Sequence, residues 1–368
     1  MLFKDFKQRI LAITLVFALI LGTLFINSQP SIPSNIQSLD LKLTKNAFYI
    51  DEEDYAQTMQ TEVEPYINTF KTTDYLTTSD HASLYYEHYL LENPLAHVVI
   101  AHGFTESSQK YKEVIYYFLK SGYSVSILDH RGHGYSDRMI LDEDSSKVYI
   151  DTFDTYLNDL KSFMDQAVLP LSPDVPHFLY AHSMGGGMGA LFIERYPEYF
   201  DAAVLSSPMM EIDTGSYPKP IATLITKLMV LLGQGKNYVF GHGPYENELN
   251  FEESPATSQP RYIYFAEKKQ NDSALQLGGS TFSWLNASLN ATKQLTKNAH
   301  LASIPILVFQ SEKDDLVKPG GQYTFVQGAP NATLIYVPNA KHELYLTDNA
   351  ILIPYFNTVL NFFESHIL

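Results

Sequence analysis

Short apolar runs rich in β-branched residues alternate with amphipathic stretches along most of the chain. Six such runs lie at residues 97–103, 124–129, 177–182, 202–207, 305–310 and 333–337. Apolar residues recur at helical spacing in stretches between these runs, at 111–120, 153–168 and 187–196. Runs that are apolar on both faces are typical of parallel strands that helices cover on both sides. The pattern therefore predicts an α/β protein built from βαβ units around a mostly parallel sheet.

One connection, between the fourth and fifth of these runs, is far longer than an ordinary loop, at about 95 residues. It contains an apolar helical stretch at 221–232, followed by polar and aromatic residues punctuated by glycine. We interpret this segment as a cap inserted into the sheet-bearing core. The predicted organisation is a linker and N-terminal extension at 28–65, a core at 66–208 and 301–368, and a cap at 209–300.

The N-terminus contains a run of uncharged, mostly apolar residues at 10–26. Three basic residues and one acidic residue precede it, namely Lys4, Lys7, Arg9 and Asp5. As a helix this run would be about 26 Å long, at the short end of a bilayer span. We expect residues 1–27 to be an uncleaved signal anchor, with a cleaved signal peptide or a buried core helix as the alternatives. Basic residues on the N-terminal side place that side in the cytoplasm. The remaining residues then lie on the non-cytoplasmic side, anchored to a bacterial inner membrane or secreted if the segment is cut.

The amino-acid composition argues against several kinds of binding partner and several kinds of catalytic chemistry. The chain has 368 residues, a net charge of −16, 45% hydrophobic residues and no cysteine. This much apolar material indicates a folded globular protein, and the missing cysteines exclude disulfides, thiolate catalysis and Cys-ligated zinc. The acidic balance argues against a nucleic-acid partner, because binding a polyanion requires a basic patch.

The same acidic charge bears on membrane contact. Residues 1–27 carry three positive charges and one negative charge, so the remainder carries −18. We expect such a domain not to adhere electrostatically to anionic lipid. Any attachment to a membrane should come from the apolar N-terminal segment or from apolar side chains on the protein surface.

The most informative stretch is FLYAHSMGGG at residues 178–187. Ser183 stands there between a buried strand and the start of a helix, with small neighbours. Such a serine lies on a strained turn that lifts its hydroxyl clear of the sheet. The usual pattern is G-x-S-x-G, and Ala181 at the first position is a mild departure. The alternative, a glycine-rich helix start selected for close packing, is weaker in this strand-turn-helix context. We therefore predict that Ser183 is a nucleophile.

A serine nucleophile needs a base and a carboxylate to orient that base. His342 follows the last predicted strand, where a loop can reach the nucleophile. The other downstream histidines belong to the cap, its edge or the C-terminal helix, namely His242, His300 and His366. The loop after the strand at 305–310 offers Asp314 or Asp315 as the acid, and spacing alone does not exclude Glu312.

The oxyanion that forms during acyl transfer needs backbone donors. The expected donors are the amides of Met184, which follows the nucleophile, and Phe104, in the loop after the first long apolar run. We interpret His102 as a packing and turn residue. DHRGHG at 129–134 looks like a metal cluster, but its glycine spacing and Arg131 favour a turn held by charge-assisted hydrogen bonds. No metal or cofactor is expected.

Four motifs carry a resemblance to a known family: DHRGHGYSDR at 129–138, AHSMGG at 181–186, SPM at 207–209 and GGSTFSW at 278–284. In these motifs the chain resembles the α/β-hydrolase superfamily, in its branch of monoglyceride lipases and lysophospholipases, and is most similar there to the bacterial PldB-type lysophospholipases. The resemblance covers roughly residue 66 to the C-terminus. It implies a doubly wound, mostly parallel sheet, with a cap inserted between the sixth and seventh core strands.

The resemblance also bears on the site. The D-x-L-V pattern at 314–317 selects Asp314 as the acid, and K-H-E at 341–343 supports His342. Ser311, where many members have glycine, and the apolar N-terminus are departures. We expect a serine hydrolase that cleaves the acyl ester of lysophospholipids, with the apolar stretch at 221–232 sheltering the acyl chain. The alternatives are a monoacylglycerol lipase, another carboxylesterase, a serine aminopeptidase-like hydrolase, and a non-catalytic anchored binding module.

Overall fold

A computed structural model describes residues 32–33, 36–42, 48–140 and 144–367. The apolar run at 10–26 lies outside these ranges, so the expected signal anchor or signal peptide stays a prediction. Within the described ranges, no helix has both the length and the apolar character needed to cross a bilayer.

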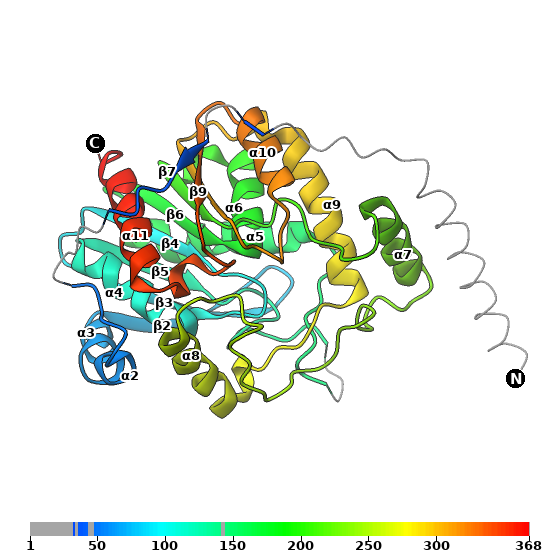
Figure 1. Ribbon diagram of the computed structural model, residues 1–368, viewed down its shortest axis with the longest axis horizontal. Coiled ribbons are helices and arrows are strands. Elements are labelled where there is room, and N and C mark those ends of the chain that lie inside the picture. The colour runs from blue at the N-terminus through cyan, green and yellow to red at the C-terminus, as the bar shows by residue number, and fades with distance from the viewer. Residues whose placement is uncertain (1–31, 34–35, 43–47, 141–143, 368) are drawn as a thin grey trace, which may run out of the picture.

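A single mixed sheet of nine strands forms the centre of the described chain, in the order β1-β9-β8-β7-β6-β4-β5-β3-β2 (Figure 1). The first seven strands in this order, from β1 through β9 to β5, pair in parallel with their neighbours. The last two are antiparallel, because β3 pairs antiparallel with both β5 and β2. The strands are β1 Gln37–Ser38, β2 Lys71–Thr77, β3 Ser83–Tyr89, β4 Ala96–Ala101, β5 Tyr123–Leu128, β6 His177–His182, β7 Ala202–Ser206, β8 Ile306–Ser311 and β9 Ala332–Val337. The predicted α/β class with a mostly parallel sheet is confirmed.

The six apolar runs of the sequence correspond to β4 to β9. The hairpin of β2 and β3 and the short edge strand β1 were not predicted from the sequence. The hairpin escaped because β2 reads KTTDYLT and buries only Leu76 of its seven residues. An edge strand with one face in water lacks the continuous apolar run that marks a central parallel strand.

Helices cover both faces of the sheet because successive residues of a strand point to opposite sides. Val98 and Ile100 of β4 join the apolar cluster under α4 and α11, whereas Val99 and Ala101 join the cluster under α5 and α6. The longer helices are α4 Lys112–Lys120, α5 Phe153–Phe163, α6 Ser183–Arg195, α7 Lys219–Leu231, α8 Gln259–Asn271, α9 Phe282–Asn298, α10 Pro319–Gly328 and α11 Asn349–Glu364. The short helices are α2 Tyr55–Thr58, η1 Met59–Val63, α3 Glu64–Asn68, η2 Ser108–Tyr111, η3 Met164–Val168, η4 Leu169–Leu171, η5 Pro197–Tyr199, η6 Ser273–Leu275, η7 Ala299–Leu301 and η8 Leu344–Leu346.

The long insertion lies between β7 and β8, which are the sixth and seventh strands when counted from β2. Its three longer helices, α7, α8 and α9, have different attachments. α9 packs on α6 and α10 of the core, and α7 packs on α9. α8 is fixed to the core by Arg261, whose buried guanidinium donates to both carboxylate oxygens of Glu113 in α4. In Figure 1, α7 lies on the far side of α9 from the sheet.

Candidate active site

Ser183 lies at the junction of β6 and α6, at the carboxyl end of a central strand. Its φ angle is +52°, in the left-handed region that a residue with a side chain rarely adopts. The strained turn predicted from the sequence is therefore present, and such strain is typical of functional positions. At the start of α6, the serine also lies at the positive end of the helix dipole.

Small residues around Ser183 allow this turn to approach the neighbouring strand. A Cβ at Gly185 would lie 2.2 Å from the carbonyl oxygen of Ala101 in β4, so a larger residue does not fit. Ala181, the departure from the usual motif, is accommodated because a glycine faces it. A Cβ at Gly189 would already lie 3.4 Å from the Cβ of Ala181. The methyl group therefore occupies space that glycine leaves on α6.

Three side chains from distant parts of the chain meet at Ser183. The Nε2 atom of His342 lies 2.7 Å from the Ser183 Oγ, and its Nδ1 lies 2.6 Å from Oδ2 of Asp314. Asp314 accepts hydrogen bonds through Oδ1 from the amides of Leu316 and Val317, both at 3.0 Å. The loops after β8 and β9 thus place an acid and an imidazole in line with the hydroxyl. This is the geometry of an activated serine nucleophile.

The other sequence candidates lie elsewhere. Asp315 is exposed and lines the neighbouring cavity, and Glu312 accepts from the amide of Asn339 at 2.7 Å. His242 contacts Ser280 in the insertion. His300 belongs to η7, and His366 follows α11. Among these candidates, only His342 lies within hydrogen-bonding distance of Ser183. Only Asp314 lies within hydrogen-bonding distance of Nδ1 of His342.

Of the two expected oxyanion donors, one directly follows the serine in the chain and the other lines the same cavity. Met184 is the second residue of α6, so its amide has no carbonyl four residues earlier in the helix to bond. Phe104 lines the same cavity as Ser183 and follows Gly103, whose amide donates to Glu106 at 2.6 Å. Their role as oxyanion donors stays a prediction.

A buried charge network beside the site was not found from the sequence. Glu106 accepts from the hydroxyl of Tyr345 at 2.5 Å and from the ammonium of Lys110 at 3.0 Å, and Lys110 also bonds Glu343. Burial opposes ionisation of Glu106, but Lys110 and the neighbouring donors hold its pKa well below the usual value. Burial raises the pKa of Glu343, and Lys110 partly offsets that effect. In the sequence, Glu106 and Lys110 have only the i,i+4 spacing of an ordinary surface pair.

The DHRGHG segment is the turn that the sequence predicted. Arg131 bonds Asp159 at 2.7 and 2.9 Å and Asp80 at 2.6 and 2.9 Å. Asp129 accepts from the amides of Ser108 at 2.6 Å and Tyr135 at 2.9 Å. These charge-assisted bonds fix the conformation of the segment. Among the described residues, no group of three or more acidic or histidine side chains is arranged to hold a metal ion.

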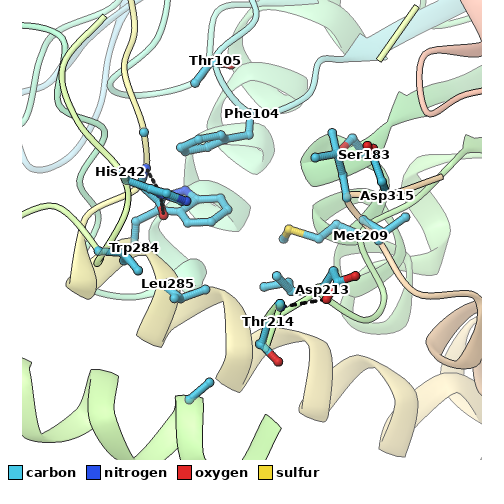
Figure 2. A pocket seen from close by; sticks show the side chains of 18 of the residues that line it. Phe104, Thr105, Ser183, Met209, Asp213, Thr214, His242, Trp284, Leu285 and Asp315 are labelled. Carbon is cyan, nitrogen blue, oxygen red and sulfur yellow. Dashed lines mark hydrogen bonds between the residues drawn. The ribbon is translucent and has the colours of Figure 1, made fainter. Parts of the chain in front are cut away.

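A cavity of about 810 Å³ opens above Ser183 and His342. Its walls are mostly apolar, and one of them is the inner side of α7, with Ala222, Ile225 and Thr226. The rings of Phe104 and Trp284 pack with their centroids 4.1 Å apart, and Figure 2 shows this pair across the cavity from Met209 and Asp315. The cavity therefore offers a mostly apolar space that reaches Ser183.

The sheet order, the inserted cap and a serine on a strand-helix turn define a serine hydrolase with the α/β-hydrolase fold. Residues 92–349 match the family described as serine aminopeptidase, S33, and the chain belongs to this family. It is 34% identical to a probable lysophospholipase L2 of Haemophilus influenzae, over 82% of this chain and 94% of the relative. It is 30% identical to lysophospholipase L2 of Escherichia coli, over 73% of this chain and 80% of the relative.

Solved structures support the fold. A soluble variant of monoglyceride lipase from Saccharomyces cerevisiae, in complex with a substrate analog, superposes with a TM-score of 0.64 at 19% identity, over 80% of this chain and 94% of that one. The resemblance to the branch of monoglyceride lipases and lysophospholipases is confirmed, and the chain is a carboxylic ester hydrolase of this branch.

Proposed function

We propose that the protein is a lysophospholipase that works through Ser183, His342 and Asp314 and an acyl-enzyme intermediate. The observation that carries the proposal is the continuous hydrogen-bonded line from the Ser183 hydroxyl to His342 and Asp314, at 2.7 and 2.6 Å. A serine hydroxyl becomes an effective nucleophile when an oriented imidazole accepts its proton.

In the proposed reaction, Ser183 attacks the ester carbonyl carbon while Nε2 of His342 takes the hydroxyl proton. The amides of Met184 and Phe104 donate to the oxyanion that forms. His342 then gives its proton to the leaving glycerol oxygen, and the acyl group remains on Ser183. A water molecule, deprotonated by His342, hydrolyses this acyl-enzyme and releases a fatty acid. Asp314 holds the imidazole in the required tautomer throughout.

The cavity supports a substrate with one acyl chain. Its walls are mostly apolar, and each buried methylene contributes about 0.8 kcal/mol. The two relatives at 34% and 30% identity are named lysophospholipases.

One observation favours a monoacylglycerol as the second candidate substrate. The described lining of the cavity contains four carboxylates and no Lys or Arg, the carboxylates being Glu106, Asp213, Asp315 and Glu343. A phosphate group buried there would lack a direct cationic partner, whereas the uncharged glycerol of a monoacylglycerol needs none. The phosphate of a lysophospholipid must therefore stay near the mouth of the cavity.

A substrate panel on the full chain tests the proposal, with the Ser183→Ala variant as control. Lysophosphatidylcholine, a monoacylglycerol and an aminoacyl arylamide are compared at equal concentration, and product release is measured. We expect release of fatty acid from lysophosphatidylcholine to be fastest and to be lost in Ser183→Ala. Faster cleavage of the monoacylglycerol would identify the second candidate, and preference for the arylamide would contradict both.

Labelling with a fluorophosphonate separates an enzyme from a binding module. The folded parent protein should react and Ser183→Ala should not. A folded parent chain that fails to label would show that the fold serves binding alone.

A further inference from the structure

The loop after β4 has a strained backbone where it borders the cavity. Thr105 has a φ angle of +60°, in the left-handed region that a β-branched residue rarely adopts. Phe104 and Thr105 both line the cavity that reaches Ser183 (Figure 2). Strain of this kind persists only where the surrounding contacts hold the backbone in place. The turn formed by residues 103–106 therefore needs a specific contact to keep its shape.

The side chain of Glu106 supplies that contact by folding back onto its own turn. Its Oε2 accepts from the amide of Gly103 at 2.6 Å. A glycine is needed for this approach, because a Cβ at residue 103 would lie 2.8 Å from the same oxygen. Among the described residues, no protein acceptor is found for the next amide, that of Phe104. The carboxylate therefore fixes the peptide before Phe104, while the Phe104 amide stays available to a substrate.

The carboxylate of Glu106 is 4% exposed and accepts from four donors. Besides the Gly103 amide, Oε2 accepts from the hydroxyl of Tyr111 at 2.7 Å. Oε1 accepts from the hydroxyl of Tyr345 at 2.5 Å and from the ammonium of Lys110 at 3.0 Å. Burial favours the neutral acid, but Lys110 and the hydroxyl donors hold the pKa of Glu106 well below its usual value. The group therefore stays a carboxylate, the form that can accept all four bonds.

Two of these donors connect the turn to the segment that carries His342. Tyr345 lies three positions after His342. Lys110 bonds Glu343, the next residue after His342, as well as Glu106. The buried carboxylate of Glu106 is thus bonded both to the turn that contains a candidate oxyanion donor and to the segment that contains the base.

We propose that Glu106 is a positioning residue for the oxyanion site. It holds the strained turn so that the amide of Phe104 faces the oxyanion that forms on the carbonyl attacked by Ser183. This inference rests on the proposed acyl transfer at Ser183, which gives the Phe104 amide its role. Such donors stabilise the transition state because they are already in place when the negative charge develops. The second donor, the amide of Met184, belongs to α6 and does not depend on this turn.

Replacing the carbonyl oxygen of the substrate by sulfur separates oxyanion binding from nucleophilic attack. In a thionoester the negative charge develops on sulfur, which is a weak hydrogen-bond acceptor, so the oxyanion site stabilises it less. Ser183 and His342 act on both esters in the same way. The ratio of kcat/KM for a soluble short-chain ester to that for its thionoester therefore reports on the oxyanion site. The variant is Glu106→Met in the full chain, which removes every acceptor atom at nearly constant side-chain length.

Glu113→Met is the matched control. Glu113 is also 4% exposed and also bonds two tyrosine hydroxyls and one cation, from Tyr55, Tyr117 and Arg261. It lies in α4 and is not part of the described cavity lining. The two substitutions therefore remove similar buried interactions, but only Glu106→Met frees the turn at residues 103–106.

In Glu106→Met, kcat for the ester should fall about 10²-fold, the effect of losing one oxyanion donor, with KM near the parental value. The thionoester should be affected much less, so the ratio should fall, whereas Glu113→Met should keep the parental ratio. Urea unfolding shows which variants fold. If Glu106→Met does not fold, Glu106→Gln, which keeps one acceptor oxygen, should give a smaller fall in the ratio.

An unchanged ratio in the folded Glu106 variant, or an equal fall in Glu113→Met, would overturn the proposal. Release of fatty acid from lysophosphatidylcholine is measured separately on the parent chain. A parent that cleaves the soluble ester but not this lipid would contradict the lysophospholipase assignment, and the ratio would still decide the role of Glu106.

Discussion

Replacing Asp314 by Asn should abolish most of the activity while leaving the fold intact. In the structure, Oδ1 of Asp314 accepts from the amides of Leu316 and Val317, and Oδ2 lies 2.6 Å from Nδ1 of His342. The oxygen of an asparagine must take the place of Oδ1, because an NH2 group cannot accept from those two amides. The NH2 group then points at His342, so Nδ1 has to accept a hydrogen bond. The ring proton moves to Nε2, where it blocks transfer of the Ser183 proton.

The size of the effect follows from this tautomer. A triad with the wrong imidazole tautomer loses about 10⁴ in kcat, equivalent to about 5.5 kcal/mol of transition-state stabilisation. KM should stay near its parent value, because residue 314 is not part of the cavity wall and substrate binding does not depend on the tautomer. The free energy of unfolding should also change little, since the asparagine keeps both amide hydrogen bonds.

Asp315→Asn is the matched control, because it removes the same charge from the adjacent, exposed position that lines the cavity. Steady-state kinetics on a soluble ester are measured for both variants, with urea unfolding to confirm that they fold. Asp315→Asn should keep a kcat close to that of the parent. If Asp314→Asn retained more than about a tenth of the parental kcat, or if Asp315→Asn lost as much, the tautomer argument would be refuted.

Two further predictions concern stability. Arg131→Met leaves the buried carboxylate of Asp159 without its partner, so urea unfolding should show a loss of about 3–5 kcal/mol, and an unchanged midpoint would contradict the structural role of this arginine. Burial lowers the pKa of His97, His102 and His182 to about 3, so the unfolded chain binds protons that the folded chain excludes. Stability should be highest above about pH 6.5 and fall by about 1.4 kcal/mol per unit for each such histidine as the pH decreases towards 3, and a flat pH profile would contradict this assignment.

The central sheet could be predicted because its strands are buried on both faces. Such strands are mostly apolar, and β4 to β8, which are buried at every position, stand out in the sequence for that reason. The hairpin of β2 and β3 could not be found in this way. Its two strands are defined by their pairing with each other and with β5, and not by a continuous apolar run. The separate attachments of α7, α8 and α9 were also hidden. They depend on contacts such as Arg261 with Glu113, which lie 148 positions apart.

The residue pattern alone is enough to predict the α/β class, the serine between strand and helix, and the histidine after the last strand. These features depend on local patterns, because a buried strand, a tight turn and a strand end each require particular residue types within a few positions. Spacing left three carboxylates open as the acid, and the family resemblance selected Asp314, which the structure places against His342. The contacts of Lys110 with Glu106 and Glu343, and the exposure of leucines on α7, could be found only in the folded structure. Each of these outcomes depends on distances between segments that are remote in the chain. Such distances are set by how the helices and loops pack around the sheet.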